Sequence, residues 1–328
     1  MTFKIKMASV AAVAAVVALT LAGCSAGAST SGSSDAAAAP GNKICVYTHG
    51  DGGTFWSVFQ AGAEQAAADL NVTLDYQGST NDSAKQAQTI TAGIAAGCQG
   101  IAASAPDAAA IKTAMLAARD AGIPTVTANS GSEVFAELGA FTHIGQDEIV
   151  AGRAAGEKFN EMGLKNILCP IQEAANSGLT DRCKGAAETF SGTVTEFNLD
   201  GALADLTGAE AKLSAALTAD PTIDGIFALN ADVATGAALP AATASGREVM
   251  IGTIDMSADA LDAIKAGTIA FAIDQQQYAQ GYLAVVLLNL DINNGNEVGG
   301  GVPIYSGPGF VTADNVDAVI ALVAAGTR

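Results

Sequence analysis

The chain has 328 residues, half of them hydrophobic, and a formal net charge of −18. A chain of this length and composition can bury two sizeable cores, so it belongs to the folded rather than the disordered class. Binding to nucleic acid is not expected, because the basic residues form no cluster that could neutralise phosphates. The negative charge also disfavours adsorption to anionic lipid.

The first 23 residues have the pattern of a secretory signal peptide. Lys4 and Lys6 precede an apolar stretch at positions 8–21, and small residues then lead to Cys24. Residues 21–24 resemble a bacterial lipobox, in which the cysteine becomes the lipidated first residue of the mature protein. The alternatives are an ordinary signal peptide with an incidental cysteine and an uncleaved anchor.

Residues 24–42 are rich in Ser, Ala and Gly and predict a flexible tether. No later stretch is long and apolar enough to predict a membrane span. We therefore expect an exported protein, held by a lipid on Cys24 to the outer face of the cell membrane.

From residue 43 onwards, short β-rich segments alternate with Ala-rich helical segments. This alternation predicts a parallel sheet covered by helices on both faces. The expected strands are 44–48, 72–76, 100–104, 125–128 and 141–145, and the expected helices between them are 55–70, 83–96 and 108–121.

A second series of the same kind follows, and the two series predict an α/β fold with two doubly wound parallel-sheet lobes. Its strands are expected at 166–171, 194–198, 225–229, 249–254 and 268–273, and its helices at 147–161, 179–190, 208–217, 231–242 and 258–266. A long helix to about residue 290, strands at 302–305 and 309–311 and a helix at 313–325 complete the chain.

Four cysteines remain after the lipobox, and an even number in an exported protein suggests disulfides. Cys45 and Cys98 each begin a predicted strand, and these strands would be neighbours, so we expect them to pair. Cys169 and Cys183 flank one strand–loop–helix unit and form the second expected pair. Four buried free thiols are the alternative. Metal binding is not expected, because no two cysteines have C-x-x-C spacing.

The loop after the first strand combines polar and aromatic side chains. His49 and Asp51 lie among glycines, and Phe55 and Trp56 open the following helix. Ligands of open α/β sheets bind at such strand ends. Flat aromatic faces beside hydrogen-bonding groups suit a sugar or polyol, which has both C–H faces and hydroxyls. The alternative is that the two aromatic residues belong to the core.

Several segments, in their order and spacing, resemble the sugar-binding proteins of bacterial ABC importers, specifically those of the ribose/galactose type. The resemblance covers nearly all of residues 43–328 and extends to the effector domains of LacI-type repressors. The segments that carry it include Thr54-Phe55-Trp56, Ala105-Pro106-Asp107, Ala121-Gly122-Ile123-Pro124, Ile144-Gly145-Gln146-Asp147, Asp181-Arg182-Cys183-Lys184-Gly185, Leu229-Asn230-Ala231-Asp232, Ile251-Gly252-Thr253-Ile254-Asp255 and Gly307-Pro308-Gly309-Phe310.

The resemblance implies the type I periplasmic binding protein fold, with two lobes joined by a three-strand hinge and the ligand in the cleft between them. Lobe one would be 43–146 plus 276–303, and lobe two 147–275 plus 304–328. The crossings would lie near Gln146/Asp147, Gln275/Gln276 and Pro303/Ile304. Ligand binding would close the hinge.

The resemblance also implies ligand contacts. Phe55 and Trp56 match the pair of rings that stack on the sugar, and Arg182 matches a cleft arginine whose planar fork can donate to two hydroxyls. Ribose binders have an Asp followed by an Arg where this chain has Asn129-Ser130, which argues for a ligand unlike ribose. The other expected contacts are Asn230, Asp255 and Gln275, and, on matching loops, Asp51, Ser104, Gln146, Asn176 and His49.

Each of these positions has a plainer interpretation. Asn230 and Asp255 could cap the helices that follow them, and Arg182 could be a solvated surface charge. His49 could be a buried histidine that is hydrogen-bonded beside its loop.

The resulting hypothesis is a lipid-anchored, monomeric solute-binding protein without cofactor or catalytic activity. It would bind a neutral sugar, polyol or cyclitol and deliver it to the permease and ATPase subunits of an ABC transporter. The alternative is a signalling receptor that presents a furanosyl autoinducer or a nucleoside. An exported glycosidase would need two facing carboxylates; Asp51 and Asp255 could supply them, but no nucleophile elbow or catalytic triad is evident.

Overall fold

The computed structural model describes residues 41–328, which form one compact unit. The predicted signal peptide, the lipidation site Cys24 and nearly all of the predicted tether lie outside the described residues. Within residues 41–328, none of the helices combines the length and the apolar character that crossing a membrane requires.

The first lobe contains a six-stranded sheet in the order β11-β5-β4-β3-β1-β2, with all neighbours parallel. Its central strands are buried on both faces, which explains their continuous runs of small and β-branched residues. The strands are β1 (Lys43–Thr48), β2 (Thr73–Gly78), β3 (Gly100–Ala103), β4 (Thr125–Asn129), β5 (Thr142–Gly145) and β11 (Ile304–Tyr305).

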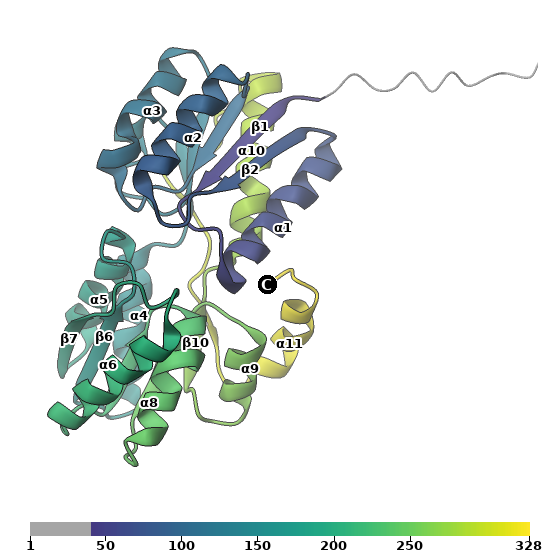
Figure 1. Ribbon diagram of the computed structural model, residues 1–328. Coiled ribbons are helices and arrows are strands. Elements are labelled where there is room, and N and C mark those ends of the chain that lie inside the picture. Colours follow the sequence, from purple (N-terminus) through teal and green to yellow (C-terminus); the bar gives the residue numbers. More distant parts are fainter. Residues whose placement is uncertain (1–40) are drawn as a thin grey trace, which may run out of the picture. The chain divides into compact units, whose positions relative to one another are not determined.

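Helices cover both faces of this sheet. On one face, α1 (Gly53–Leu70) and α10 (Gln277–Asn294) lie side by side, and on the other α2 (Ser83–Ala95) packs against α3 (Ala108–Asp120) (Figure 1). The first pair approaches closely because Gly62 and Gly281 carry no side chain: a Cβ on Gly62 would lie 2.1 Å from the backbone oxygen of Tyr278. A short 3₁₀ turn, Ala136–Leu138, follows β4.

The second lobe repeats this plan in the order β12-β10-β9-β8-β6-β7. Only the edge strand β12 runs antiparallel to its neighbour. The strands are β6 (Asn166–Ile171), β7 (Thr193–Asn198), β8 (Gly225–Ala228), β9 (Met250–Ile254), β10 (Phe271–Asp274) and β12 (Gly309–Val311).

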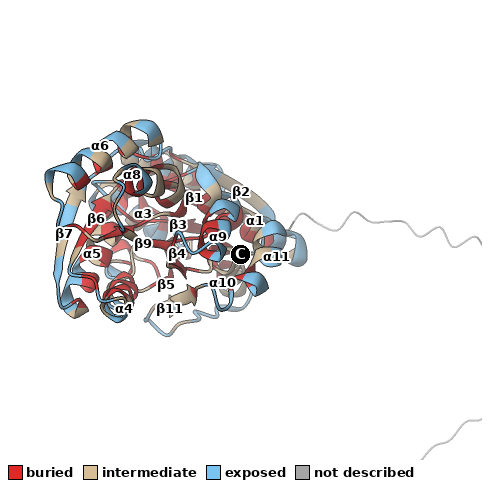
Figure 2. Cartoon of the chain, turned by 90° about the horizontal axis from the view of Figure 1, so that it is seen from below, coloured by how far each residue is buried: buried red, intermediate tan, exposed pale blue. Residues whose placement is uncertain are grey.

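One face of the second sheet is covered by α4 (Glu148–Glu161) and α5 (Ser177–Thr189), which pack against each other. The other face carries α6 (Leu206–Ala219), α9 (Ala258–Lys265), α11 (Val316–Ala324) and a composite helix. That helix consists of α7 (Ala231–Val233), a π-helical turn η2 (Ala234–Ala238) and α8 (Leu239–Ala244), where the sequence predicted one uninterrupted helix at 231–242. Figure 2 shows the central strands buried, the edge strands β2 and β7 partly exposed, and the outer faces of the helices exposed.

The third crossing between the lobes lies later than predicted. Ile304 pairs with Ile144 of β5, so residues 304–305 belong to the first lobe, and the prediction that lobe two resumes at 304 is wrong. The backbone N–H of Ser306 also donates to the carbonyl of Gly145 at 2.7 Å. Edge pairing with β5 therefore holds the chain in the first lobe until Ser306, and it reaches the second sheet only at Gly309.

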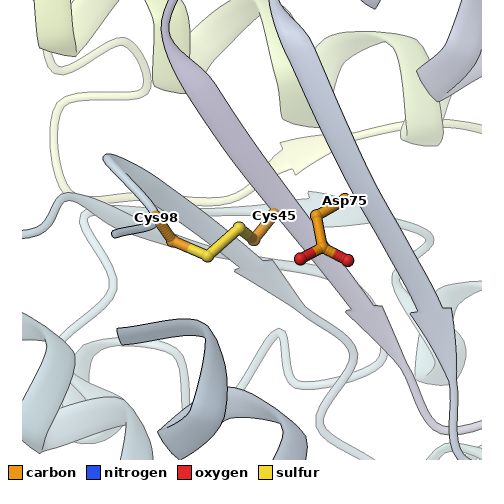
Figure 3. Close-up of side chains that lie close together, drawn as sticks. All are labelled: Cys45, Asp75 and Cys98. Atoms are coloured by element: carbon orange, nitrogen blue, oxygen red, sulfur yellow. A yellow bond between two sulfur atoms is a disulfide. The ribbon is translucent and has the colours of Figure 1, made fainter. Parts of the chain in front are cut away.

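Both predicted disulfides are confirmed. Cys45 and Cys98 lie on or beside neighbouring strands with their Cα atoms 5.9 Å apart, and the Cα atoms of Cys169 and Cys183 are 6.0 Å apart. Asp75 lies beside the first bridge (Figure 3). The sulfurs there are bonded to each other, so they offer no thiolate to a metal ion.

Candidate functional site

A cavity of about 600 Å³ lies between the lobes, at the carboxyl ends of the parallel strands. The loops β1–α1, β2–α2 and β4–β5 line it from the first lobe, and the loops β6–α5, β7–α6, β8–α7 and β9–α9 from the second. Of the predicted contacts, the cavity lining includes His49, Asp51, Phe55, Trp56, Asn129, Asn176, Arg182, Asn230, Asp255 and Gln275.

Phe55 and Trp56 form an aromatic wall at the start of α1. Their rings meet edge-to-face with centroids 4.9 Å apart, and Trp56 meets the His49 ring in the same way at 4.8 Å. Each is at most 8% exposed, and both also touch the hydrophobic core of the first lobe. The core interpretation and the ligand interpretation therefore apply to the same two side chains.

Arg182 is buried in the cavity wall, so the interpretation of Arg182 as a solvated surface charge is wrong. Its Nε donates to Oε2 of Glu148 at 2.6 Å and its Nη2 to Oε1 at 2.9 Å, while Nη1 donates to the carbonyl of Leu229 at 2.9 Å. A guanidinium has five N–H groups, so two remain for a ligand. Burial lowers the pKa of Arg182, but Glu148 outweighs that effect and the pKa is raised overall.

The position of Arg182 depends on a close contact between helices. α4 carries Gly152 where α5 passes, and a Cβ on this glycine would lie 2.2 Å from the carbonyl oxygen of Arg182. Gly185 fits against α4 in the same way, because its Cβ would lie 2.3 Å from the carbonyl oxygen of Ile149. These glycines let the helices approach until Glu148 reaches the guanidinium.

Asp255 is held by two amides at the ends of neighbouring strands. Gln275 Nε2 donates to its Oδ1 at 2.6 Å, and Asn230 Nδ2 donates to its Oδ2 at 3.2 Å. Burial raises the pKa of Asp255 to about 7, although Arg182 and Gln275 act in the opposite direction. Ser257 caps the next helix, so the cap interpretation of Asp255 is wrong.

Asn230 has both of the roles considered for it. Its Oδ1 accepts the backbone N–H groups of Asp232 and Val233, which makes it the N-cap of α7. Its Nδ2 at the same time contacts Asp255 beside the cavity. The cap fixes the rotamer of the amide and thereby fixes where its other end points.

Asn129 ends β4 with a left-handed backbone (φ 66°), and its Oδ1 accepts from the hydroxyl of Ser130 at 2.8 Å. Both residues line the cavity. A neutral amide and a hydroxyl therefore occupy the two positions at which the resemblance to ribose binders implies an Asp followed by an Arg.

Two predicted contacts do not line the cavity. Ser104 lies behind His49, where its hydroxyl accepts the backbone N–H of His49 at 2.7 Å and contacts Nδ1 at 2.8 Å. Gln146 is fully buried at the first crossing, and its Nε2 donates to Oε2 of Glu148 at 2.9 Å. Each supports a residue that does line the cavity. His49 is buried and hydrogen-bonded, as one of its two interpretations held, and it also faces the cavity.

Sequence reasoning missed four acidic residues in the lining: Glu148, Glu173, Asp232 and Asp259. Each directly follows a strand end or opens a helix beside one, and this position was the available signal. Burial raises the pKa of Glu173, but the contacts of its carboxylate with His49 and Asn176 and the charge of Arg182 outweigh burial and lower the pKa to about 2.

Side chains also meet across the cleft. The hydroxyl of Thr54 donates to Oδ1 of Asp232 at 3.2 Å, and Asn81 Nδ2 donates to Oε1 of Glu173 at 3.3 Å. The hydroxyl of Ser177 approaches the carbonyl of Pro106 at 3.4 Å. The lobes are therefore in contact around the cavity, which is the geometry of a closed cleft.

The sequence matches the family described as a periplasmic binding protein domain over residues 44–296. The ribose import binding protein of Haemophilus influenzae is 28% identical over 76% of this chain and 85% of its own length. A putative rhizopine-binding protein of Rhizobium meliloti is 30% identical over 69% of this chain and 77% of its own length.

A solved structure is more similar still. The carbohydrate transporter from Acidothermus cellulolyticus, crystallised in complex with myo-inositol, is 39% identical, with a TM-score of 0.84 over 88% of this chain and 100% of its own. These relatives are named as binding proteins and a transporter rather than as enzymes. The chain belongs to the periplasmic binding protein domain family.

Proposed function

We propose that this protein binds a neutral cyclitol or sugar in the cavity between its lobes, and that inositols are the first ligands to test. The observation that carries the proposal is the composition of the cavity wall. Phe55 and Trp56 offer apolar ring faces, while Arg182 offers donors and Asp255 offers acceptors. A ring with C–H faces and a belt of hydroxyls satisfies all of these groups together.

The comparisons support this ligand class. The Acidothermus cellulolyticus protein, at 39% identity, was crystallised with myo-inositol. The ribose import binding protein of Haemophilus influenzae is less similar, at 28% identity. The Asn129-Ser130 pair also departs from the residues that the resemblance to ribose binders implies, so we place inositols before ribose.

The proposal is tested by measuring the melting temperature of residues 39–328 in the presence of inositols, alditols and monosaccharides. One narrow ligand group should raise the melting temperature by several degrees, because a ligand that binds only the folded state stabilises it by about 2.7 kcal/mol at 100 times its Kd. Trp56→Ala should lose that rise. If no neutral carbohydrate raises the melting temperature, the ligand class is wrong.

The second part of the proposal is export and delivery. Lipid on Cys24 would hold the protein at the outer face of the cell membrane, where it would pass its ligand to the permease and ATPase subunits of an ABC transporter. Detergent phase partitioning of the full chain expressed in bacteria tests the anchor. The wild type should enter the detergent phase and Cys24→Ser should remain in water; equal partitioning of the two would contradict lipidation.

A further inference from the structure

We infer that Glu173 bridges the lobes through His49 and Asn81 and sets how long the ligand stays in the closed cleft. This inference rests on the proposed function and concerns the same cavity. We call Glu173, His49 and Asn81 the distal bridge.

The bridge consists of one carboxylate from the second lobe and two side chains from the first. Oε1 of Glu173 accepts from Asn81 Nδ2 at 3.3 Å, and Oε2 lies 3.7 Å from Nε2 of His49. The His49 side chain is 6% exposed and that of Glu173 16% exposed. At this degree of burial, water screens the contact between His49 and Glu173 less than it screens a surface ion pair, whereas the hydrogen bond from Asn81 lies at the exposed edge of the bridge.

The first-lobe side of the bridge is held rigidly. Ser104 bonds both the backbone N–H and the Nδ1 of His49, and the carbonyl of His49 accepts the backbone N–H of Asn81 at 2.7 Å. Thr80 and Asn81 both have left-handed backbones, with φ of 54° and 60°. For a β-branched residue such as Thr80 this conformation is strained, and strain of this kind gathers at functional sites.

The second-lobe side is equally ordered. Asn176 Nδ2 donates to Oε2 of Glu173 at 2.8 Å, and its backbone N–H donates to the carbonyl of Glu173 at 3.0 Å. Ala174, which follows Glu173 in the chain, donates its backbone N–H to Oδ1 of Asp200 at 2.9 Å. The carboxylate is therefore already oriented before the lobes meet, so little conformational freedom is lost on closure.

The bridge also stands between two cavities. A second cavity of about 330 Å³ adjoins the ligand cavity, and all three bridge residues line both. Gln172 also lines both, and its Oε1 is buried with no hydrogen-bond partner among the described residues. The bridge residues are therefore part of the wall that the two cavities share, and parting of the lobes at the bridge would connect the ligand cavity to the smaller one.

The test compares binding kinetics of Glu173→Ala and wild type, using residues 39–328 and myo-inositol as the probe. Alanine removes both acceptor oxygens, so the dissociation rate should rise about tenfold with the association rate nearly unchanged, because the bridge forms after the ligand has entered. Glu188→Ala, the same change on a surface ion pair of the same lobe, should alter neither rate.

A double-mutant cycle separates bridging from direct ligand contact. If Glu173 acts through Asn81, the double variant Asn81→Ala with Glu173→Ala should dissociate about as fast as Glu173→Ala alone, because alanine leaves no acceptor for the Asn81 amide. If the two single effects multiply in the double variant, the two residues act as independent ligand contacts and the bridge is overturned. An unchanged dissociation rate in Glu173→Ala would overturn it as well.

A distance measurement covers the case in which wild-type protein does not bind myo-inositol, which would count against the proposed function and not against the bridge. Spin labels at Gln88→Cys in α2 and Lys212→Cys in α6 report the separation of the lobes from exposed positions. Unliganded wild type should show a minor short-distance population, too small to alter the association rate, that Glu173→Ala loses. Identical distance distributions in the two proteins would overturn the bridge.

Discussion

Arg182 and Glu148 form a two-point ion pair inside the wall of the ligand cavity, with donor–acceptor distances of 2.6 and 2.9 Å. Glu148 opens α4, directly after the first crossing between the lobes, and Arg182 lies within α5. The pair therefore connects the hinge region to the ligand site. It also fixes which N–H groups of the guanidinium remain free to donate.

Glu148→Gln should weaken ligand binding at least tenfold and lower the free energy of unfolding by about 3 kcal/mol, because it leaves the Arg182 charge buried without its partner. Isothermal titration with myo-inositol and urea unfolding measure the two effects. Glu157→Gln, at an exposed position of the same helix, is the matched control and should change neither. Wild-type values for both quantities in Glu148→Gln would show that the pair is dispensable.

Asp255 should make unfolding depend on pH. Its folded pKa of about 7 lies above the ordinary value of 3.8. Its contribution to stability is therefore complete below about pH 4 and is lost as the pH rises through 7. Asp255→Asn should remove this fall, which urea unfolding of the unliganded protein at several pH values measures. An identical pH profile in the variant would contradict the burial of an ionisable group there.

His143 should have the opposite effect. Burial lowers its pKa to about 3, from an ordinary value of 6.5. Below about pH 6.5 the imidazole of His143 binds a proton in the unfolded chain but stays neutral in the folded protein. The contribution of His143 to stability therefore shrinks as the pH falls from 6.5 towards 3. In His143→Gln, the free energy of unfolding should vary less over that range. A profile as steep as that of wild type would assign the acid sensitivity to other groups.

The two disulfides should differ in how much they stabilise the fold. Their sequence separations are 14 for Cys169–Cys183 and 53 for Cys45–Cys98. Loop-closure entropy gives about 3 kcal/mol for the shorter loop and about 4 kcal/mol for the longer one. Replacing each pair by serines and measuring urea unfolding tests the order. A larger loss from the Cys169–Cys183 pair would show that local packing outweighs chain entropy.

The sequence by itself determined the features that depend on neighbours along the chain. Alternating β-rich and Ala-rich segments predicted the two lobes, because hydrophobic periodicity and helix caps act within a few residues. The same holds for Phe55 and Trp56 beside the cavity and for the Cys169–Cys183 bridge, whose partners flank one strand–loop–helix unit. Cys45–Cys98 followed from the expected order of neighbouring strands.

Only the tertiary structure decided which partner each polar side chain finds. Glu148 meets Arg182 because Gly152 lets two helices approach, and Glu173 meets Asn81 only because the lobes close on each other. Edge pairing with β5 likewise placed the third crossing after Tyr305 rather than before Ile304. Such contacts join residues far apart in the chain, and their energies depend on distance and burial, which no local pattern specifies.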